Sequence, residues 1–190
     1  MLSPVDIRLN LREWVECRMG LSPTDVLIDE LGFVNRAKDK APDYTYRADL
    51  ALANGRLVGF EIKSGADTLK RWPDQSQAYL RVFDEVWLCT HGKHLEKAMA
   101  ITPKQAGVML VDDYGSLAVV REAKRSNSVD AYDLSGLLWK EELIELCDIN
   151  QIETKSRETK ADLRLKVSSI LGLDSIRQHV LEKLKIRKHS

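Results

Sequence analysis

The fold is decided by residues 45–63, which read TYRADLALANGRLVGFEIK. Polar and apolar side chains alternate through residues 45–53 and again through 57–63, which is the pattern of β-strands. Between them stands Asn54-Gly55, the strongest short signal for a β-hairpin. We therefore expect two neighbouring antiparallel strands in the middle of a sheet.

The alternation also predicts which side chains share a face of this hairpin. The apolar face consists of Ala48, Leu50, Leu52, Val58, Phe60 and Ile62. If that face joins a core, Asp49, Glu61 and Lys63 emerge together on the other face. A two-residue Asn-Gly turn would pair Asp49 with Phe60 and put this aspartate on the wrong face. The pattern therefore predicts an odd number of loop residues, or a β-bulge, around Asn54-Gly55.

Two carboxylates beside a lysine suit the hydrolysis of a phosphodiester. A divalent cation assists that reaction by neutralising the phosphate and lowering the pKa of an attacking water. Mg²⁺ and Mn²⁺ prefer oxygen ligands, which Asp49, Glu61 and the carbonyl group of Ile62 can supply. The ammonium group of Lys63 can orient the water or stabilise the developing negative charge. These residues predict a metal-dependent nuclease.

A family resemblance follows from these residues and from the helix after them. Asp49, then eleven residues, then Glu61-Ile62-Lys63 resembles the motif of the PD-(D/E)XK nuclease superfamily, although Ala48 stands where that motif has proline. Gln75-Ser76-Gln77-Ala78-Tyr79 resembles the QxxxY motif of its RecB-like members. Small bacterial and phage proteins of this type carry FEIKS before a segment like Asp67-Thr68-Leu69-Lys70-Arg71.

The resemblance covers residues 22–111 and has consequences for fold and function. It implies a restriction-endonuclease-like core, which is a mixed central sheet flanked by helices. It also implies a Mg²⁺- or Mn²⁺-dependent nuclease that acts on DNA. Asp49, Glu61 and Lys63 would be catalytic, and Gln75 and Tyr79 would brace them.

Other charged residues near the motif have two interpretations each. Ser22, Pro23 and Gly32 predict a helix over residues 22–31. Glu30 would end this helix, where the helix dipole disfavours an acid. The superfamily often places an acid from its first core helix near the metal, so Glu30 is either a further metal ligand or a surface glutamate.

Lys70 and Arg71 could contact a substrate phosphate or lie on a solvated helix face. Asp67 fits a helix N-cap better than a metal ligand.

The chain divides by composition near residue 124. Residues 1–123 predict an α/β domain. Its expected helices are 4–19, 67–83 (interrupted at Pro73) and 92–100, and its further strands are 85–90, 107–111 and 117–120. A polar linker over residues 124–128 leads to a helical module, 124–190, with expected helices 134–147, 158–171 and 174–187.

The C-terminal module is basic. From residue 155 onward it has ten lysines and arginines against four acids. Such a segment can contact phosphates, or it can simply cap an exposed core face. Both interpretations remain open at this point.

Overall composition restricts the partners and the compartment. The chain has 190 residues, 29 basic and 29 acidic, so any nucleic-acid partner must meet a local basic surface. Cys17, Cys89 and Cys147 are odd in number and widely spaced, which favours a reducing cytoplasm. No signal peptide or membrane span is expected, and a homodimer is left open. The rival to the enzyme is a catalytically silent nuclease-fold module that binds nucleic acid or a protein.

Overall fold

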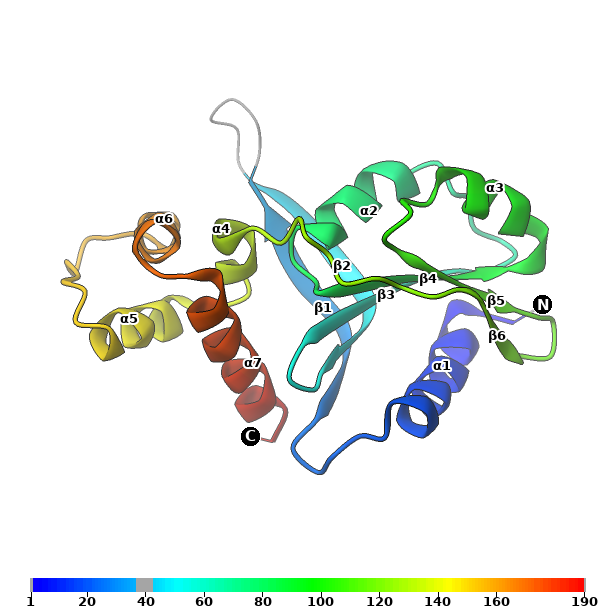
Figure 1. Cartoon of the computed structure of the whole chain (residues 1–190), viewed down its shortest axis with the longest axis horizontal. Coiled ribbons are helices and arrows are strands. Elements are labelled where there is room, and N and C mark those ends of the chain that lie inside the picture. The colour runs from blue at the N-terminus through cyan, green and yellow to red at the C-terminus, as the bar shows by residue number, and fades with distance from the viewer. Residues whose placement is uncertain (1, 37–42, 190) are drawn as a thin grey trace.

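A computed structural model describes residues 2–36 and 43–189 (Figure 1). The central sheet contains strands β1 (Val26–Asn35), β2 (Tyr44–Ala53), β3 (Leu57–Lys63), β4 (Glu85–His91), β5 (Gly107–Val111) and β6 (Leu117–Arg121). The flanking helices are α1 (Pro4–Met19), α2 (Trp72–Leu80), the 3₁₀ turn η1 (Gly92–His94) and α3 (Leu95–Ile101). The C-terminal helices are α4 (Ala131–Ser135), α5 (Lys140–Ile149), α6 (Lys160–Ile170) and α7 (Leu173–His189).

The sheet is mixed and its strands lie in sequence order, β1-β2-β3-β4-β5-β6. The pairs β1/β2, β2/β3 and β5/β6 are antiparallel, whereas β3/β4 and β4/β5 are parallel. This arrangement confirms the predicted fold class, an α/β protein with a mixed sheet, flanking helices and helices at the C-terminal end. In the described part of the chain, no helix is long and apolar enough to cross a membrane.

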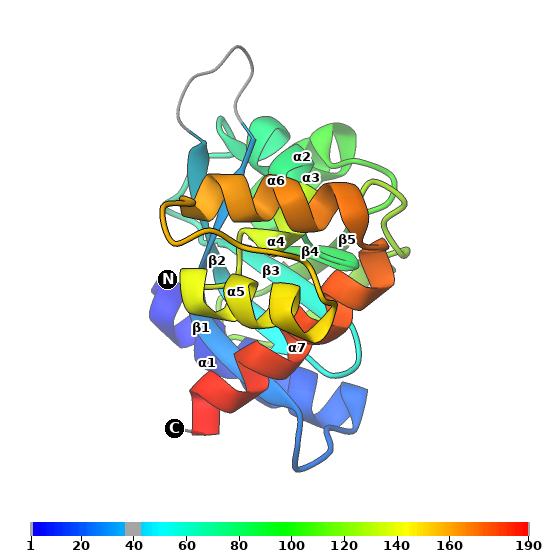
Figure 2. The same cartoon turned by 90° about the vertical axis from the view of Figure 1, so that its left-hand side faces the viewer.

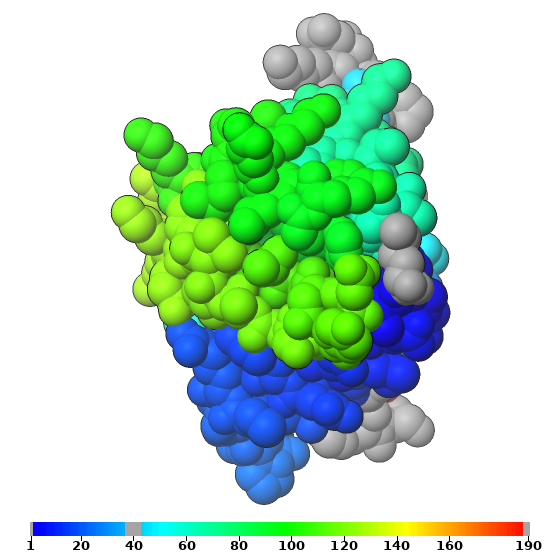
Figure 3. All heavy atoms as spheres, turned by 90° about the vertical axis from the view of Figure 1, so that its right-hand side faces the viewer, coloured from blue at the N-terminus to red at the C-terminus, as the bar shows by residue number. Residues whose placement is uncertain are grey.

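Helices cover both faces of the sheet. On one face, Ile7, Leu11 and Val15 of α1 pack against Leu50 and Phe60. The other face lies under α2 and α3, and its core continues into α4–α7 beside β1 (Figures 1 and 2). Figure 3 shows the opposite end, where α1 lies beside the segment from α3 to β6. The charged face of the hairpin is therefore largely enclosed.

The hairpin has the register that its apolar pattern required. Ala53 pairs with Leu57, so the loop holds three residues, Asn54, Gly55 and Arg56. Gly55 has φ of 92°, a conformation that glycine adopts readily. The prediction of an odd loop is confirmed.

One face assignment in the hairpin is wrong. Ala48 was predicted to lie with Leu50, but it packs in the opposite core with its partner Leu31. The pairing of β1 with β2 skips Glu30, whose φ is 54°. This left-handed residue changes the alternation of the side chains, so that Leu31 and Val26 contribute to the same core although they are five residues apart.

The helix predicted over residues 22–31 is also wrong. Ser22 and Asp25 do form a local turn, in which the Ser22 N–H donates to Asp25 Oδ2 at 2.8 Å. The chain then extends into β1 and pairs with β2 from Val26↔Ala53 to Asn35↔Tyr44. Pairing with a distant strand has overridden the local capping signals, as tertiary context often does.

The C-terminal helices follow the prediction except at the start. The helix expected over 134–147 is two helices, α4 and α5, because the Trp139 N–H donates to Glu142 Oε2 at 2.6 Å and begins α5. Helices α6 and α7 lie close to the expected segments 158–171 and 174–187.

Many basic side chains of this segment face the protein. Their acidic partners give the ion pairs Arg164–Asp43, Lys166–Glu158, Arg177–Asp84, Lys183–Glu145, Lys185–Asp25 and Arg187–Glu142. The side chain of Lys188 lies outside the described part of the structure. These contacts favour the structural cap over the substrate surface.

Candidate active site

The site forms where β2 and β3 separate. Their ladder ends at the pair Leu50↔Phe60. Beyond it, Asp49 Oδ2 accepts a hydrogen bond of 2.7 Å from the Ile62 N–H, so a side chain takes the place of a strand partner. This contact holds the Asp49 carboxylate beside the β3 segment that carries Glu61 and Lys63.

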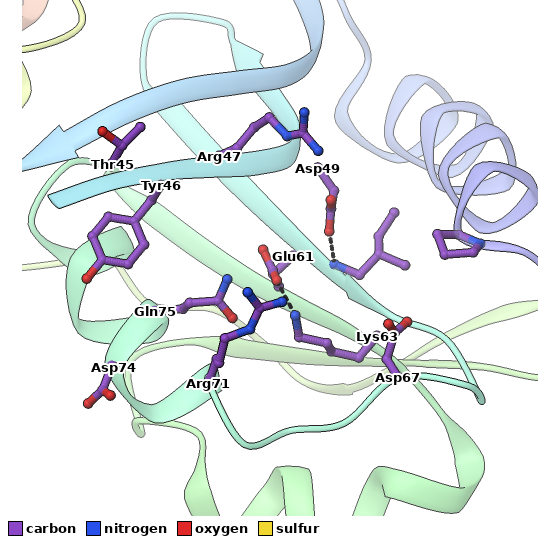
Figure 4. A pocket seen from close by; sticks show the side chains of 12 residues that line it. Thr45, Tyr46, Arg47, Asp49, Glu61, Lys63, Asp67, Arg71, Asp74 and Gln75 are labelled. Atoms are coloured by element: carbon purple, nitrogen blue, oxygen red, sulfur yellow. Dashed lines mark hydrogen bonds and ion pairs between the residues drawn. The ribbon is translucent and has the colours of Figure 1, made fainter.

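The three motif residues line one cavity of about 610 Å³ (Figure 4). The cavity is bordered by Pro4, Thr45, Tyr46, Arg47, Asp49, Glu61, Ile62, Lys63, Asp67, Arg71, Asp74 and Gln75. Asp49 and Glu61 therefore lie on the same side of the sheet, as the alternation predicted.

Glu61 is held at both carboxylate oxygens. Lys63 Nζ donates to Oε1, and the Tyr79 hydroxyl donates to Oε2 at 2.5 Å. Glu61 and Lys63 are only 3% and 7% exposed. The same tyrosine hydroxyl is 3.3 Å from the Arg47 carbonyl oxygen. These contacts give Glu61 a fixed orientation towards the cavity.

Burial changes the acidity of two of these groups. It raises the pKa of Asp49 to about 6, and the nearby charge of Glu61 acts in the same direction. The Ile62 N–H, Lys63 and Arg8 oppose this rise. Burial and the Glu61 charge raise the pKa of Tyr79 well above its ordinary value, so its hydroxyl remains a donor. A cation near the two carboxylates would relieve their mutual repulsion.

Gln75 and Arg71 reach the cavity from α2 and the turn before it (Figure 4). Gln75 Oε1 is buried and has no hydrogen-bond partner within residues 2–36 and 43–189. An unpaired buried acceptor is rare, and a cation or an ordered water would satisfy it. Lys70, predicted with Arg71 as a phosphate contact, is exposed and does not border the cavity.

Glu30 is not at a helix end, so the argument that made it a metal ligand is wrong. It lies on β1 because this segment pairs with β2. Its carboxylate binds Arg8 and Arg47 instead. Asp67 borders the cavity but accepts hydrogen bonds from the Ser64 N–H and hydroxyl, which makes it a turn residue rather than a helix N-cap.

The sequence interpretation missed Arg47 and Arg8. Arg47 lies two residues before Asp49 on β2, so strand alternation could have suggested it. Arg8 comes from α1, and nothing in the sequence indicates that this helix reaches the motif.

The donor set fits a hard divalent cation. Asp49, Glu61, the Ile62 carbonyl and Gln75 Oε1 offer oxygens, which Mg²⁺ and Mn²⁺ prefer. Among the described residues, no group of three or more His, Cys, Asp or Glu side chains could hold a metal. A cation here would therefore keep several waters, as Mg²⁺ usually does.

Fold and site together define a mixed α/β protein with a carboxylate–lysine centre where two strands diverge. The chain belongs to the family described as Bacteriophage P4 protein cII, whose model matches residues 6–190. It is 28% identical over 193 residues to "Protein cII" of Enterobacteria phage P4, covering 100% of this chain and 69% of that protein.

A solved structure also shows similarity to the chain. It is SPO1766, a protein of unknown function from Silicibacter pomeroyi, with 15% identity and a TM-score of 0.48. The match covers 83% of this chain and 99% of that one.

Proposed function

We propose that this chain is a Mg²⁺- or Mn²⁺-dependent nuclease that hydrolyses phosphodiester bonds, with DNA as its substrate. The observation that carries the proposal is the meeting of Asp49, Glu61 and Lys63 in one cavity, with Tyr79 fixing Glu61. The resemblance of these residues to the PD-(D/E)XK and QxxxY motifs supports it.

Each residue has a distinct task in this proposal. Asp49 and Glu61, with the Ile62 carbonyl, hold the cation. A bound cation would neutralise the phosphate and lower the pKa of water. Lys63 donates to the attacking water or to the charge that develops on the phosphate. Tyr79 keeps Glu61 oriented, and Gln75 presents its free oxygen to the water around the cation.

The ionisation of Asp49 sets a pH requirement. Since its pKa is about 6, the carboxylate is charged and able to bind a cation above this pH. Cation affinity should therefore decline as the pH falls through 6.

A silent binding module is the second candidate, and one observation favours it. Both oxygens of Glu61 are already engaged, by Lys63 and Tyr79. A cation would have to compete with the Lys63 ammonium for this carboxylate. In that case the site would serve the binding of nucleic acid or of a protein partner rather than catalysis.

The decisive experiment compares the wild type with Asp49→Ala. Both proteins are titrated with Mn²⁺ by calorimetry and incubated with single-stranded DNA, duplex DNA and RNA in Mg²⁺ or Mn²⁺. We expect the wild type to bind the cation and cleave DNA, and the variant to lose both properties. A wild type that neither binds the cation nor cleaves any of the three substrates would refute the nuclease.

A further inference from the structure

A charged triad lies next to the proposed catalytic cavity. Glu30 Oε1 is 3.0 Å from Arg8 Nη1, and Glu30 Oε2 is 3.0 Å from Arg47 Nη1. The three residues come from β1, α1 and β2. The exposed side-chain fractions are 20% for Arg8, 45% for Glu30 and 63% for Arg47, so the triad is accessible from solvent.

Both arginines are close to the carboxylates of the site. Arg47 borders the cavity and lies beside Asp49 in Figure 4. Pro4 borders it too, and Arg8 is one turn further along the same face of α1. Burial is the main influence on the pKa of Asp49 and raises it, but the positive charge of Arg8 acts in the lowering direction. A ligand in the cavity would therefore lie within the field of both guanidinium groups.

Glu30 occupies a strained backbone position. Its φ is 54°, a left-handed conformation that is unfavourable for a residue other than glycine. The residues on either side of it pair with β2, at Asp29↔Leu50 and Leu31↔Ala48, which places Glu30 across from Asp49. Strain of this kind persists where surrounding contacts fix it, and it concentrates at binding sites. Here it directs one carboxylate between two arginines.

The guanidinium groups of Arg8 and Arg47 would attract the phosphates of a substrate strand. Before a cation binds, Asp49 and Glu61 repel the phosphates of an incoming strand; a divalent cation would offset these two carboxylates, but the phosphates on either side of the scissile bond would still carry their own negative charge. An arginine guanidinium has five N–H donors and matches the geometry of a phosphate. Each arginine of the triad uses Nη1 to contact Glu30, so one contact does not exhaust its donors.

We propose that Arg8 and Arg47 form a phosphate-binding subsite that holds the substrate backbone beside the scissile bond, with Glu30 as the residue that positions both guanidinium groups. The inference rests on the proposed nuclease function. It assigns the approach of the substrate to the α1–β2 side of the cavity. It also gives Glu30, which the sequence left open as a metal ligand or a surface glutamate, a different task.

The neighbouring pair Arg12–Asp29 provides a matched control. It joins the same two elements, α1 and β1, at 2.8 Å, and its exposed fractions of 26% and 46% resemble those of Arg8 and Glu30. Neither residue borders the cavity. Removing Arg12 changes the net charge as much as removing Arg8 alone does, but away from the site, so Arg12→Gln is compared with the single variant Arg8→Gln as well as with the double variant.

The test measures binding of a fluorescein-labelled single-stranded DNA oligonucleotide by fluorescence anisotropy. Ca²⁺ replaces Mg²⁺ so that binding is followed apart from cleavage, and salt is varied. We expect Arg8→Gln/Arg47→Gln to weaken binding about tenfold and to reduce the slope of log K against log salt by about 0.7, the value for one phosphate contact on a single strand. Arg12→Gln should stay within about twofold of the wild type because it removes only an exposed ion pair.

Two further measurements make the outcome decisive. Arg8→Lys/Arg47→Lys keeps both charges, and it provides the test if Arg8→Gln/Arg47→Gln does not fold. It should retain the salt slope but lose affinity, because an ammonium group lacks the guanidinium fork. A wild type that binds and cleaves DNA while the folded double variants bind equally well would overturn the subsite alone. An equal loss of DNA affinity in Arg12→Gln would also overturn the subsite. A wild type that does not bind or cleave would overturn the nuclease and the subsite together.

Discussion

Asp49 makes the cation-free protein sensitive to pH. Its pKa of about 6 in the folded state compares with about 4 in an unfolded chain. Between these values the folded state binds more protons, so stability falls as the pH rises from about 4 to 6. Above pH 6 the whole penalty applies, at most about 3 kcal/mol for a shift of this size.

The substitution Asp49→Asn should remove this penalty while keeping an oxygen that accepts from the Ile62 N–H. In EDTA at pH 8, we expect the variant to melt at a higher temperature than the wild type, and the difference should shrink towards pH 4. Asp74→Asn is the control, since Asp74 is an exposed acid at the border of the same cavity. A lower melting temperature for Asp49→Asn at pH 8 would contradict the prediction.

Lys63 offers the most direct test of chemistry. Lys63→Ala removes the ammonium group that we assign to the transition state, so the cleavage rate should fall about 100-fold or more with the fold retained. Mn²⁺ binding, measured by calorimetry, should persist because no oxygen ligand is lost. Lys70→Ala, an exposed lysine outside the cavity, should leave the cleavage rate unchanged. An unaltered rate in folded Lys63→Ala would remove this residue from the mechanism.

Among the secondary-structure elements, α2 connects the site to the core. Tyr79 packs its ring against Phe33, Trp72 and Phe83, with centroids 5.0–6.0 Å away, while its hydroxyl binds Glu61. The aromatic cluster therefore holds Tyr79 in place, and the Tyr79 hydroxyl in turn holds the Glu61 carboxylate.

Tyr79→Phe should separate these two roles. The ring packing stays, but buried Glu61 loses a donor, which costs about 1–3 kcal/mol of unfolding free energy. We expect a lower urea midpoint together with weaker Mn²⁺ binding. Tyr46→Phe is the control, because the Tyr46 hydroxyl makes no hydrogen bond within the described part of the chain although its side chain borders the cavity. If Tyr79→Phe matched Tyr46→Phe in both the urea midpoint and the Mn²⁺ affinity, the proposal that Tyr79 orients Glu61 would be contradicted.

The elements also show what the sequence could predict. The hairpin, the odd number of residues in its loop and the common side of Asp49, Glu61 and Lys63 follow from local alternation, whereas the face of Ala48 does not. Strand β1 could not be predicted, since its own residues carry helix-start signals and only the pairing with β2 makes them a strand. The triad of Arg8, Glu30 and Arg47 depends on this strand and on the position of α1, so the sequence could not predict the triad either.

For the whole molecule, the C-terminal helices are part of the same core as the sheet. Ile176, Val180 and Leu184 of α7 belong to the apolar cluster that contains Val26 of β1. Arg187 also packs on the Trp139 ring, at 4.1 Å from its centroid, and binds Glu142. Most of the described basic side chains of this segment therefore form ion pairs within the protein.

Charge reversal should therefore affect stability more than substrate binding. The triple variant Lys183→Glu/Lys185→Glu/Arg187→Glu breaks three ion pairs and should lower the urea midpoint, chiefly through the partly buried pair of Arg187 with Glu142. Lys155→Glu/Arg157→Glu reverses two charges at exposed positions and serves as the control; it should leave the urea midpoint unchanged. If the triple variant kept its urea midpoint but lost the salt dependence of DNA binding, the segment would be a substrate surface after all.

The contact between β1 and α7 also bears on how the chain folds as it is made. Lys185 binds Asp25 across a separation of 160 residues, and the helix that covers β1 is the last one in the described structure. A ribosome adds about 5–20 residues per second, so β1 emerges roughly 8–30 s before its covering helix. During that interval the apolar cluster that includes Val26 lacks the side chains of α7, and the nascent chain offers an apolar segment to chaperones or to neighbouring nascent chains.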